Sequence, residues 1–291
     1  MLPRQTKQIR YDGMSSSSRI WLWQRGAMTP GTPTLGTPAP RQVRALAGGA
    51  SIRPVWENEL GGLTFELMKG TDRRFVKWTP ASSGIDLDEE RVRLDWAARY
   101  VAVPVTLDHG GDADSSWLVT AALPGQSAVA PRWLAEPETA VEQIGAGLRA
   151  LHDRLPVEDC PFTASAEERL AETRGRAGRL DPATWNADHQ HLTVDEALRR
   201  LADVPPVDRL VVCHGDTCAP NTLLTDDGRW SGHVDLGQLG VADRWADLAV
   251  ATWSTQWNYG AGWEERLLEA YGVPPDPDRT HYYRLLWGLG P

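Results

Sequence analysis

Residues 210–221 read LVVCHGDTCAPN, and residues 234–237 read VDLG. The apolar run at the start of the first segment predicts a short buried strand. His214 and Asp216 follow that strand at once, and Asn221 stands five residues after Asp216. Asp235 comes at the end of a second predicted element, a hairpin that turns at an Asp-Asp-Gly sequence. Acidic and amide side chains therefore gather where buried strands end.

The spacing is that of a kinase catalytic loop, His-x-Asp-x-x-x-x-Asn, followed by a metal-binding Asp-x-Gly. Phosphoryl transfer requires a nucleophile placed in line and neutralisation of the phosphate charge. Asp216 is expected to accept the proton of an attacking hydroxyl. Asn221 and Asp235 offer hard oxygen ligands suited to Mg²⁺. His214 is expected to orient the loop backbone rather than to react.

The upstream part of the chain carries a matching cation. Lys77 lies in an apolar strand predicted over residues 74–78, where an ammonium group is unexpected. A kinase needs an ammonium group at such a position to bind the phosphates of the nucleotide. Glu90, on a helix expected over residues 87–100, is its predicted ion-pair partner, although Glu89 is adjacent and either acid could face solvent. Phe75 shares the strand face of Lys77, so it is a candidate for contact with adenine or for the core.

A connector between two parts of the chain is predicted over residues 118–123. Backbone groups of Ala121 and Leu123 are expected to read the adenine edge there. Before this connector the sequence predicts short antiparallel strands with one helix, and after it helices dominate, so the predicted class is α+β. The predicted division is a disordered tail over residues 1–44, a nucleotide-binding lobe over 45–122, and a catalytic, acceptor-binding lobe over 123–291.

Composition narrows the function classes. The 291 residues are 41% hydrophobic and carry a net charge of −9, yet residues 1–44 alone carry +6, so the remainder carries −15. An acidic body disfavours nucleic acid and suits cationic ligands. No apolar run is long enough to cross a membrane, and three cysteines predict no disulfide framework. The expected location is the cytoplasm, and Cys213 and Cys218, beside the loop, are expected to pack rather than react.

Residues 210–250 resemble the aminoglycoside phosphotransferases, most closely the 3′- and 3″-O-phosphotransferases. The resemblance rests on the HGD of residues 214–216, the GHVDLG of residues 232–237 and the GVADRWADLA of residues 240–249, and it extends over about residues 45–291. It implies a bilobal protein-kinase-like fold, with ATP or GTP and Mg²⁺ as cofactors and antibiotic resistance as the outcome. It also implies that Arg244 and Asp247 are structural and tie the following helix to the catalytic loop.

The chain departs from that family at three places. The nucleotide loop lacks the usual Gly-x-Ser, although Gly61 and Gly62 still permit close approach of a phosphate. The chain ends in LLWGLGP rather than Asp-Glu-Phe-Phe, and residues 253–259, WSTQWNY, are aromatic where the family has acids. These departures bear on the acceptor, for which Asp188, Glu196 and Trp257 are the candidate contacts. The missing Glu-Phe-Phe end favours a 3″ streptomycin-type hydroxyl over a 3′ kanamycin-type one.

Other functions stay open at this point. The chain could phosphorylate another small hydroxylated metabolite, or bind nucleotide as a pseudokinase. A metal-dependent phosphohydrolase built on Asp216, His214 and Asp235 would leave Lys77 and Glu90 unexplained. The enzyme is expected to be a monomer or a weak dimer.

Overall fold

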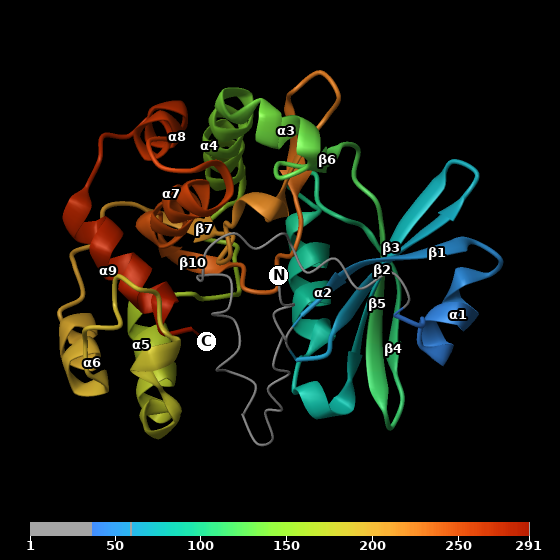
Figure 1. Ribbon diagram of the computed structural model, residues 1–291, viewed down its shortest axis with the longest axis horizontal. Helices are drawn as coiled ribbons and strands as arrows, with labels where there is room; N and C mark the ends of the chain where they lie inside the picture. Colours follow the sequence, from blue (N-terminus) through green and yellow to red (C-terminus); the bar gives the residue numbers. More distant parts are fainter. Residues whose placement is uncertain (1–36, 59, 291) are drawn as a thin grey trace, which may run out of the picture.

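The computed structural model describes residues 37–58 and 60–290, and it separates into a sheet lobe and a mainly helical lobe (Figure 1). The elements of the N-terminal lobe are α1 (Arg41–Ala47), β1 (Ser51–Glu57), β2 (Leu63–Lys69), β3 (Asp72–Pro80), η3 (Ala81–Ser83), α2 (Leu87–Ala97), β4 (Thr106–Gly111) and β5 (Ser115–Ala121). The bilobal α+β fold is therefore as predicted.

The N-terminal sheet has five strands in the order β1-β2-β3-β5-β4, and each neighbouring pair is antiparallel. Strands β2 and β3 turn at Gly70, whose φ of 61° lies in the left-handed region that glycine adopts readily. Lys77 pairs with Thr64 on one side and with Leu118 on the other, so it stands on a central strand. The sheet thus fixes the backbone from which this side chain extends.

The small core under this sheet begins earlier in the chain than expected. Val43, on α1, is fully buried against Phe65, Leu67, Val76 and Val119. Residues 41–44 are therefore helical and packed, and the predicted tail boundary at residue 44 was too late. Residues 1–36 of the predicted tail lie outside the described residues.

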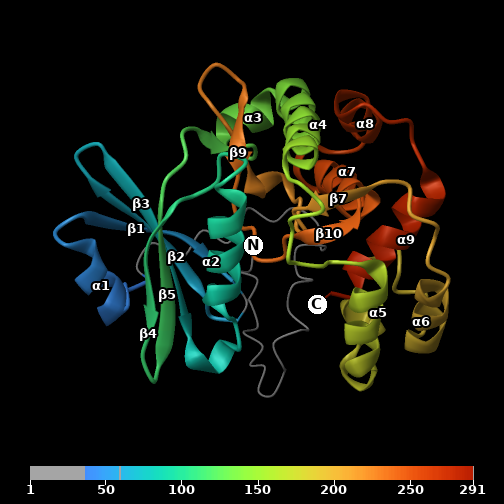
Figure 2. The same ribbon diagram turned by 180° about the vertical axis from the view of Figure 1, so that it is seen from behind.

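Helix α2 lies between the sheet and the second lobe in both ribbon views (Figures 1 and 2). The carboxylate of Asp86 caps it by accepting a hydrogen bond from Asp88 N. The helix ends at Ala97, three residues before the end that its sequence predicts. Its buried members include Glu90, an acid on the face that meets the rest of the protein.

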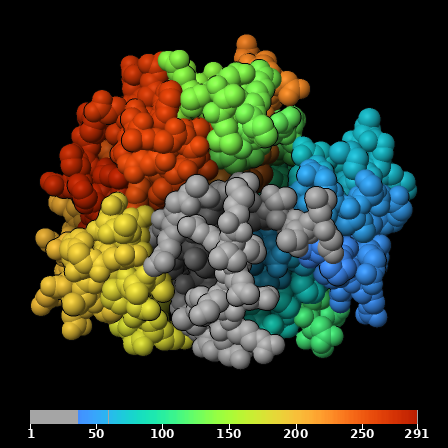
Figure 3. All heavy atoms as spheres, in the orientation of Figure 1, coloured from blue at the N-terminus to red at the C-terminus, as the bar shows by residue number. Residues whose placement is uncertain are grey.

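The second lobe contains the remaining elements. They are β6 (Gln126–Ser127), α3 (Pro131–Ala135), α4 (Pro137–Arg154), α5 (Ala166–Gly175), η4 (Ala177–Arg179), η5 (Pro182–Thr184), α6 (Val194–Ala202), β7 (Leu210–Cys213), η6 (Ala219–Asn221), β8 (Thr222–Leu224), β9 (Trp230–His233), β10 (Gly240–Asp243), α7 (Trp245–Tyr259), α8 (Glu264–Tyr271) and α9 (Pro277–Gly288). Figure 3 shows α3 and α4 in green beside the red C-terminal helices, with the blue sheet lobe on the other side.

Helix α7 is central to this lobe. It is buried almost throughout residues 245–255 and packs against α4, α8 and α9. The sequence predicts a helix from residue 242, but residues 240–243 form β10, which pairs with β7. In this antiparallel pairing Asp243 lies opposite Leu210, so α7 begins beside the start of β7. Within its first turn Asp247 reaches the backbone of His214, where the catalytic motif begins. Within the described residues, no helix combines the length and apolarity that crossing a bilayer requires.

Candidate active site

The loop after β7 brings Asp216 and Asn221 together. Asn221 Nδ2 donates to the carbonyl oxygen of Asp216 at 3.0 Å and to its Oδ2 at 3.2 Å. Asp216 Oδ1 is buried and has no hydrogen-bond partner among the described residues. A carboxylate oxygen held in this way is available to accept a proton from a bound hydroxyl. Burial, and then the negative charge of Asp235, raise the pKa of Asp216.

His214 orients this loop through both ring nitrogens. Its Nδ1 accepts a hydrogen bond from Asp216 N at 3.2 Å, and its Nε2 lies 3.0 Å from the carbonyl oxygen of Val234. A backbone N–H can only donate and a carbonyl can only accept, so the ring is neutral with its proton on Nε2. His214 therefore connects the catalytic loop to the residue before Asp235.

Asp247, on α7, holds the backbone of the same loop through hydrogen bonds. Its fully buried carboxylate accepts from His214 N at 2.6 Å and from Gly215 N at 2.9 Å, and it lies 2.9 Å from His152 Nε2. Thr217 Oγ1 donates to the Asp247 carbonyl at 2.7 Å. Burial is the largest single influence and would raise the pKa of Asp247, but His152, His214 and the N–H of Gly215 together outweigh it, so the pKa is lowered.

Sequence reasoning missed His152. It lies on the inner face of α4, where its other ring nitrogen is 2.8 Å from the Tyr271 hydroxyl. The sequence offers one signal for this residue: it is a polar residue that directly follows Leu151, beside the apolar face of the α4 helix. Arg244 requires a correction, because its guanidinium reaches Asp208 at 2.6 Å, in the segment before β7, rather than the catalytic loop.

Arg169, on α5, joins the two functional loops. Its Nη2 donates to Gln238 Oε1 at 2.8 Å and to the Gly215 carbonyl at 3.3 Å. Gly215 itself has φ = 88°, and a Cβ there would lie 2.3 Å from the Gln238 carbonyl oxygen. The base and the Asp235 loop are thus held in contact by a position that only glycine fits.

Gly215→Ala is expected to lower the free energy of unfolding by about 1–3 kcal/mol, because both the backbone angle and the Gln238 contact resist a methyl group. Urea unfolding followed by circular dichroism measures this change. Gly175→Ala is the matched control, because that helical glycine has open space around its Cβ position and alanine favours helices. Equal effects of the two substitutions would contradict the prediction.

Lys77 connects the two lobes. Its Nζ lies 2.7 Å from both carboxylate oxygens of Glu90 and 2.8 Å from Asp235 Oδ1. Burial alone would lower the pKa of Lys77, but Asp235 and Glu90 outweigh it, so the pKa is raised and the ammonium stays charged. Glu89 is exposed and lies 3.5 Å from Arg93. Glu90 is therefore the acid that contacts the lysine.

Asp235 combines exposure with an uncommon backbone. Its side chain is 51% exposed, and its φ of 67° is the one positive value among non-glycine residues in the part of the chain that the structure describes. Such a conformation persists only where surrounding contacts hold it. The ammonium of Lys77 lowers the pKa of Asp235 and keeps it ionised.

These residues fit a divalent cation. Asn221 and Asp235 contribute amide and carboxylate oxygens, which are the donors that Mg²⁺ prefers. The unpartnered Oδ1 of Asp216 adds local negative charge to the same region. A metal ion bound there would supply positive charge to the phosphate oxygens.

Burial raises the pKa of both Cys213 and Cys218, so the thiols stay protonated and pack.

The predicted nucleotide contacts lie along the sheet lobe. Asn58 Oδ1 accepts from Leu60 N at 3.0 Å and from Gly62 N at 2.7 Å, which closes the turn that contains Gly61. Ala121 N donates to Val105 O at 2.8 Å, so this residue has its carbonyl, and not its N–H, to offer to an adenine.

Leu123 and Phe75 are the other two predicted nucleotide contacts. Leu123 lies two residues beyond Ala121, next to β9, where its Cδ1 is close to Gly232. Phe75 is half-buried, with the Arg73 guanidinium 5.1 Å above its ring.

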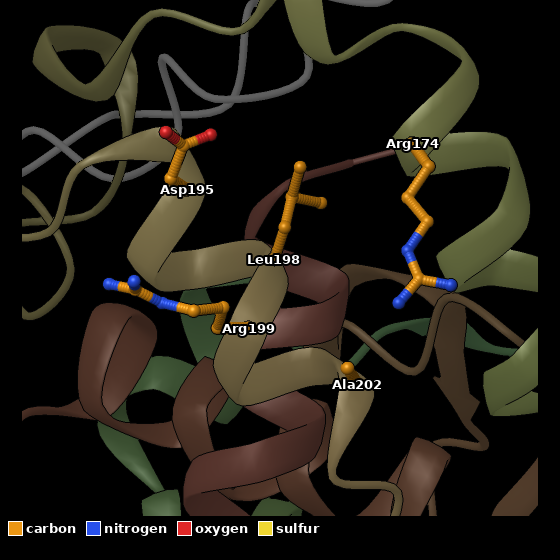
Figure 4. Close-up of a pocket in the computed structure, with 5 residues that line it drawn as sticks. All are labelled: Arg174, Asp195, Leu198, Arg199 and Ala202. Atoms are coloured by element: carbon orange, nitrogen blue, oxygen red, sulfur yellow. The ribbon is translucent and has the colours of Figure 1, made fainter.

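The candidate acceptor residues Glu196 and Asp188 have different surroundings. Glu196 caps α6: it accepts from Thr193 N and Oγ1, each at 2.8 Å. Helix α6 lies at the outer edge of its lobe in both ribbon views (Figures 1 and 2), beside a surface hollow of about 350 Å³ lined by Arg174, Asp195, Leu198, Arg199 and Ala202 (Figure 4). Glu196 therefore already serves as a helix cap, and its contact with an acceptor stays a prediction. Asp188 is exposed, and its neighbour His189 packs edge-on against Trp253 at 5.6 Å.

His189 predicts a pH-dependent stability. Burial lowers its pKa to about 4, whereas an imidazole in the unfolded chain titrates near ~6.5. The unfolded state therefore binds the proton first, so stability is present above ~6.5 and falls as the pH drops toward 4. Between pH 7 and pH 5 the free energy of unfolding of the wild type should therefore fall by ~2 kcal/mol more than that of His189→Gln, which lacks the imidazole. Thermal melting at both pH values, with exposed His191→Gln as control, measures it; an unchanged pH dependence would contradict it.

The sequence of this chain is similar to those of known phosphotransferases. The profile of the phosphotransferase enzyme family matches residues 51–283. An aminoglycoside 3′-phosphotransferase of Streptomyces fradiae is 36% identical over 79% of this chain and 91% of its own length. Streptomycin 3″-kinase of Streptomyces griseus is 33% identical over 82% of this chain and 94% of its own.

A solved structure gives the same result. Aminoglycoside phosphotransferase APH(3″)-Id from Streptomyces rimosus, in complex with ADP and streptomycin, superposes with a TM-score of 0.68 at 31% identity, over 85% of this chain and 95% of its own. The kinase-like loop, the Lys77–Glu90 pair and these matches lead to one conclusion: the chain is an enzyme that belongs to the phosphotransferase family, among the aminoglycoside phosphotransferases.

Proposed function

We propose that this enzyme transfers the γ-phosphate of ATP, or of GTP, to a hydroxyl group of an aminoglycoside antibiotic and so confers resistance to it. The observation that carries the proposal is the unpartnered, buried Oδ1 of Asp216, held beside Asn221 in the helical lobe, where Asp235 of the same lobe meets Lys77 of the sheet lobe. The names of the relatives support the acceptor class, and the acidic folded body suits a cationic substrate.

The proposed roles follow from the contacts. Asp216 Oδ1 accepts the hydrogen bond of the acceptor hydroxyl and aims its oxygen at the γ-phosphorus. A new P–O bond forms while the bond to the bridging β–γ oxygen breaks, so ADP leaves with that electron pair and the hydroxyl proton passes to Asp216. Asn221 and Asp235 would hold Mg²⁺, whose charge stabilises the phosphate oxygens.

The sheet lobe holds the nucleotide. Lys77, which Glu90 orients, contacts the α- and β-phosphates in place of its present partner Asp235. The Ala121 carbonyl and the Leu123 N–H read the adenine edge, Phe75 lies against the ring, and Gly61 and Gly62 let the backbone approach the phosphates. We infer that the enzyme acts in the cytoplasm, where the nucleotide is made, as a monomer or a weak dimer.

The test is an acceptor screen. The protein is incubated with Mg·ATP and kanamycin, neomycin or streptomycin, and products are detected by mass spectrometry as the addition of one phosphoryl group. Phosphorylation of another hydroxylated metabolite, and of no aminoglycoside, would replace the acceptor class. Nucleotide-dependent thermal stabilisation without any product would indicate a pseudokinase, and phosphate release without an acceptor a hydrolase.

A further inference from the structure

The inner face of α7 follows the catalytic loop and then continues past it. Near the start of the helix, Asp247 binds the backbone of His214 and Gly215. Two turns later, Ser254 Oγ accepts from Ala219 N at 2.8 Å. The next residue on that face, three positions on, is Trp257. The helix therefore presents this indole beside the far end of the loop that holds Asp216.

Trp257 belongs to an aromatic cluster that touches the loop directly. The cluster consists of Cys218, Val250, Trp253, Trp257 and Trp287. The ring centroids of Trp257 lie 5.1 Å from those of Trp253 and 5.9 Å from those of Trp287. Trp253 is 1% exposed and Trp287 is 9% exposed, whereas Trp257 is only half-buried. Trp257 is thus the tryptophan of the cluster that keeps the most surface for a ligand, and Cys218 connects it to the base, two residues away.

A charged pair lies against this cluster. Arg284 lies 5.5 Å above the Trp253 ring and forms an ion pair with Glu264 at 2.9 Å. His189, on the other side of Trp253, is buried and neutral, and its Nδ1 has no partner among the described residues. Asp188 is the exposed acid next to it. Several ammonium groups would each need a carboxylate when buried here. Among the described acids near the cluster, Glu264 is paired with Arg284, and Asp216 and Asp235 belong to the catalytic site, which leaves Asp188.

We infer that Trp257 determines acceptor specificity by stacking, and that the acceptor is an aminoglycoside with planar guanidinium groups, the streptomycin type, rather than a polyamine of the neomycin type. A guanidinium is delocalised, weakly hydrated and flat, so it stacks on an indole face without a carboxylate partner. The inference rests on the proposed function and names the acceptor class of that same site.

The first test compares Trp257→Ala, Trp257→Phe and the wild type with streptomycin as acceptor. We expect Trp257→Ala to raise the KM for streptomycin about tenfold, with the KM for ATP unchanged, and Trp257→Phe to raise it less. Trp263→Phe, at the start of α8 and outside the cluster, is the matched control. Far-UV circular dichroism establishes that each variant is folded. An unchanged KM for streptomycin in Trp257→Ala overturns the inference.

A second substitution tests the direction of specificity. Trp257→Asp adds a carboxylate where the indole was, so it is expected to shift the ratio of kcat/KM values toward neomycin. The wild type should show a weaker dependence of streptomycin KM on salt than an acceptor held by ion pairs would show. A wild type that prefers neomycin, with a KM that rises steeply with salt, overturns the inference.

Binding separates this inference from the proposed function. Streptomycin is titrated into the protein without nucleotide, and tryptophan fluorescence is compared between the wild type and Trp257→Phe. Quenching that disappears in the variant supports stacking at Trp257 even if no acceptor is phosphorylated, which would count against the proposed function alone. Phosphorylation of streptomycin with identical quenching in both proteins would leave the function standing and reject the role of Trp257.

Discussion

Asp216→Asn is expected to lower kcat by about 10²- to 10⁴-fold, because an amide cannot take the hydroxyl proton that the carboxylate accepts. The substitution preserves the size of the side chain, and Lys77, Glu90 and Asp235 are unchanged, so nucleotide binding is expected to persist. Steady-state kinetics measures the first effect, and thermal stabilisation by Mg·ATP measures the second.

The control for this prediction is Asp278→Asn, an exposed acid in the first turn of α9. It removes the same charge far from the loop and should leave kcat as it is. Turnover by Asp216→Asn within a few-fold of the wild type would remove Asp216 from the role of base. Loss of both turnover and nucleotide stabilisation would show instead that the substitution had disrupted the loop.

Asp247→Ala is expected to lower the free energy of unfolding by about 3–5 kcal/mol, the usual cost of breaking a buried charged network from one side. The substitution removes the acceptor for two backbone N–H groups, at His214 and Gly215, and leaves His152 without its carboxylate. Urea unfolding gives the free energy. Activity should fall as well, because the same hydrogen bonds place the loop that carries Asp216.

Asp95→Ala provides the comparison for stability. Asp95 forms a partly exposed ion pair with Arg91 at 2.9 Å on α2, and such pairs contribute ~0–1 kcal/mol. Asp247→Asn is a second comparison, since its amide oxygen can still accept one of the two backbone hydrogen bonds. Equal destabilisation by Asp247→Ala and Asp95→Ala would mean that the buried network contributes little.

Local signals predicted much of this architecture. The apolar run of β7, the hairpin of β8 and β9, and the spacing of Asp216, Asn221 and Asp235 are properties of neighbouring residues, and the structure shows the strands where they were expected. The fold class followed from the same motifs. Strands β1 and β4 were missed because edge strands have mixed, largely exposed patterns, as in the TLDHGG of β4. Helix α1 was missed because it is short and follows a proline-rich segment.

The site shows where sequence reasoning stops. Arg169 and His152 form hydrogen bonds with residues more than forty positions away in the sequence, and no pattern of neighbouring residues predicts such a contact. Glu196 shows that one side chain can serve a local role as well. It forms a capping box with Thr193 at the start of α6, so its carboxylate is already hydrogen-bonded to the helix terminus.

Helix α7 supports the catalytic loop at Asp247 and ends in a different kind of surface at Trp257. Because the two positions lie almost three turns apart, natural variation in the last turns can alter which drug is inactivated while the reaction itself is preserved. One rigid element thereby separates the evolution of the resistance spectrum from the conservation of catalysis.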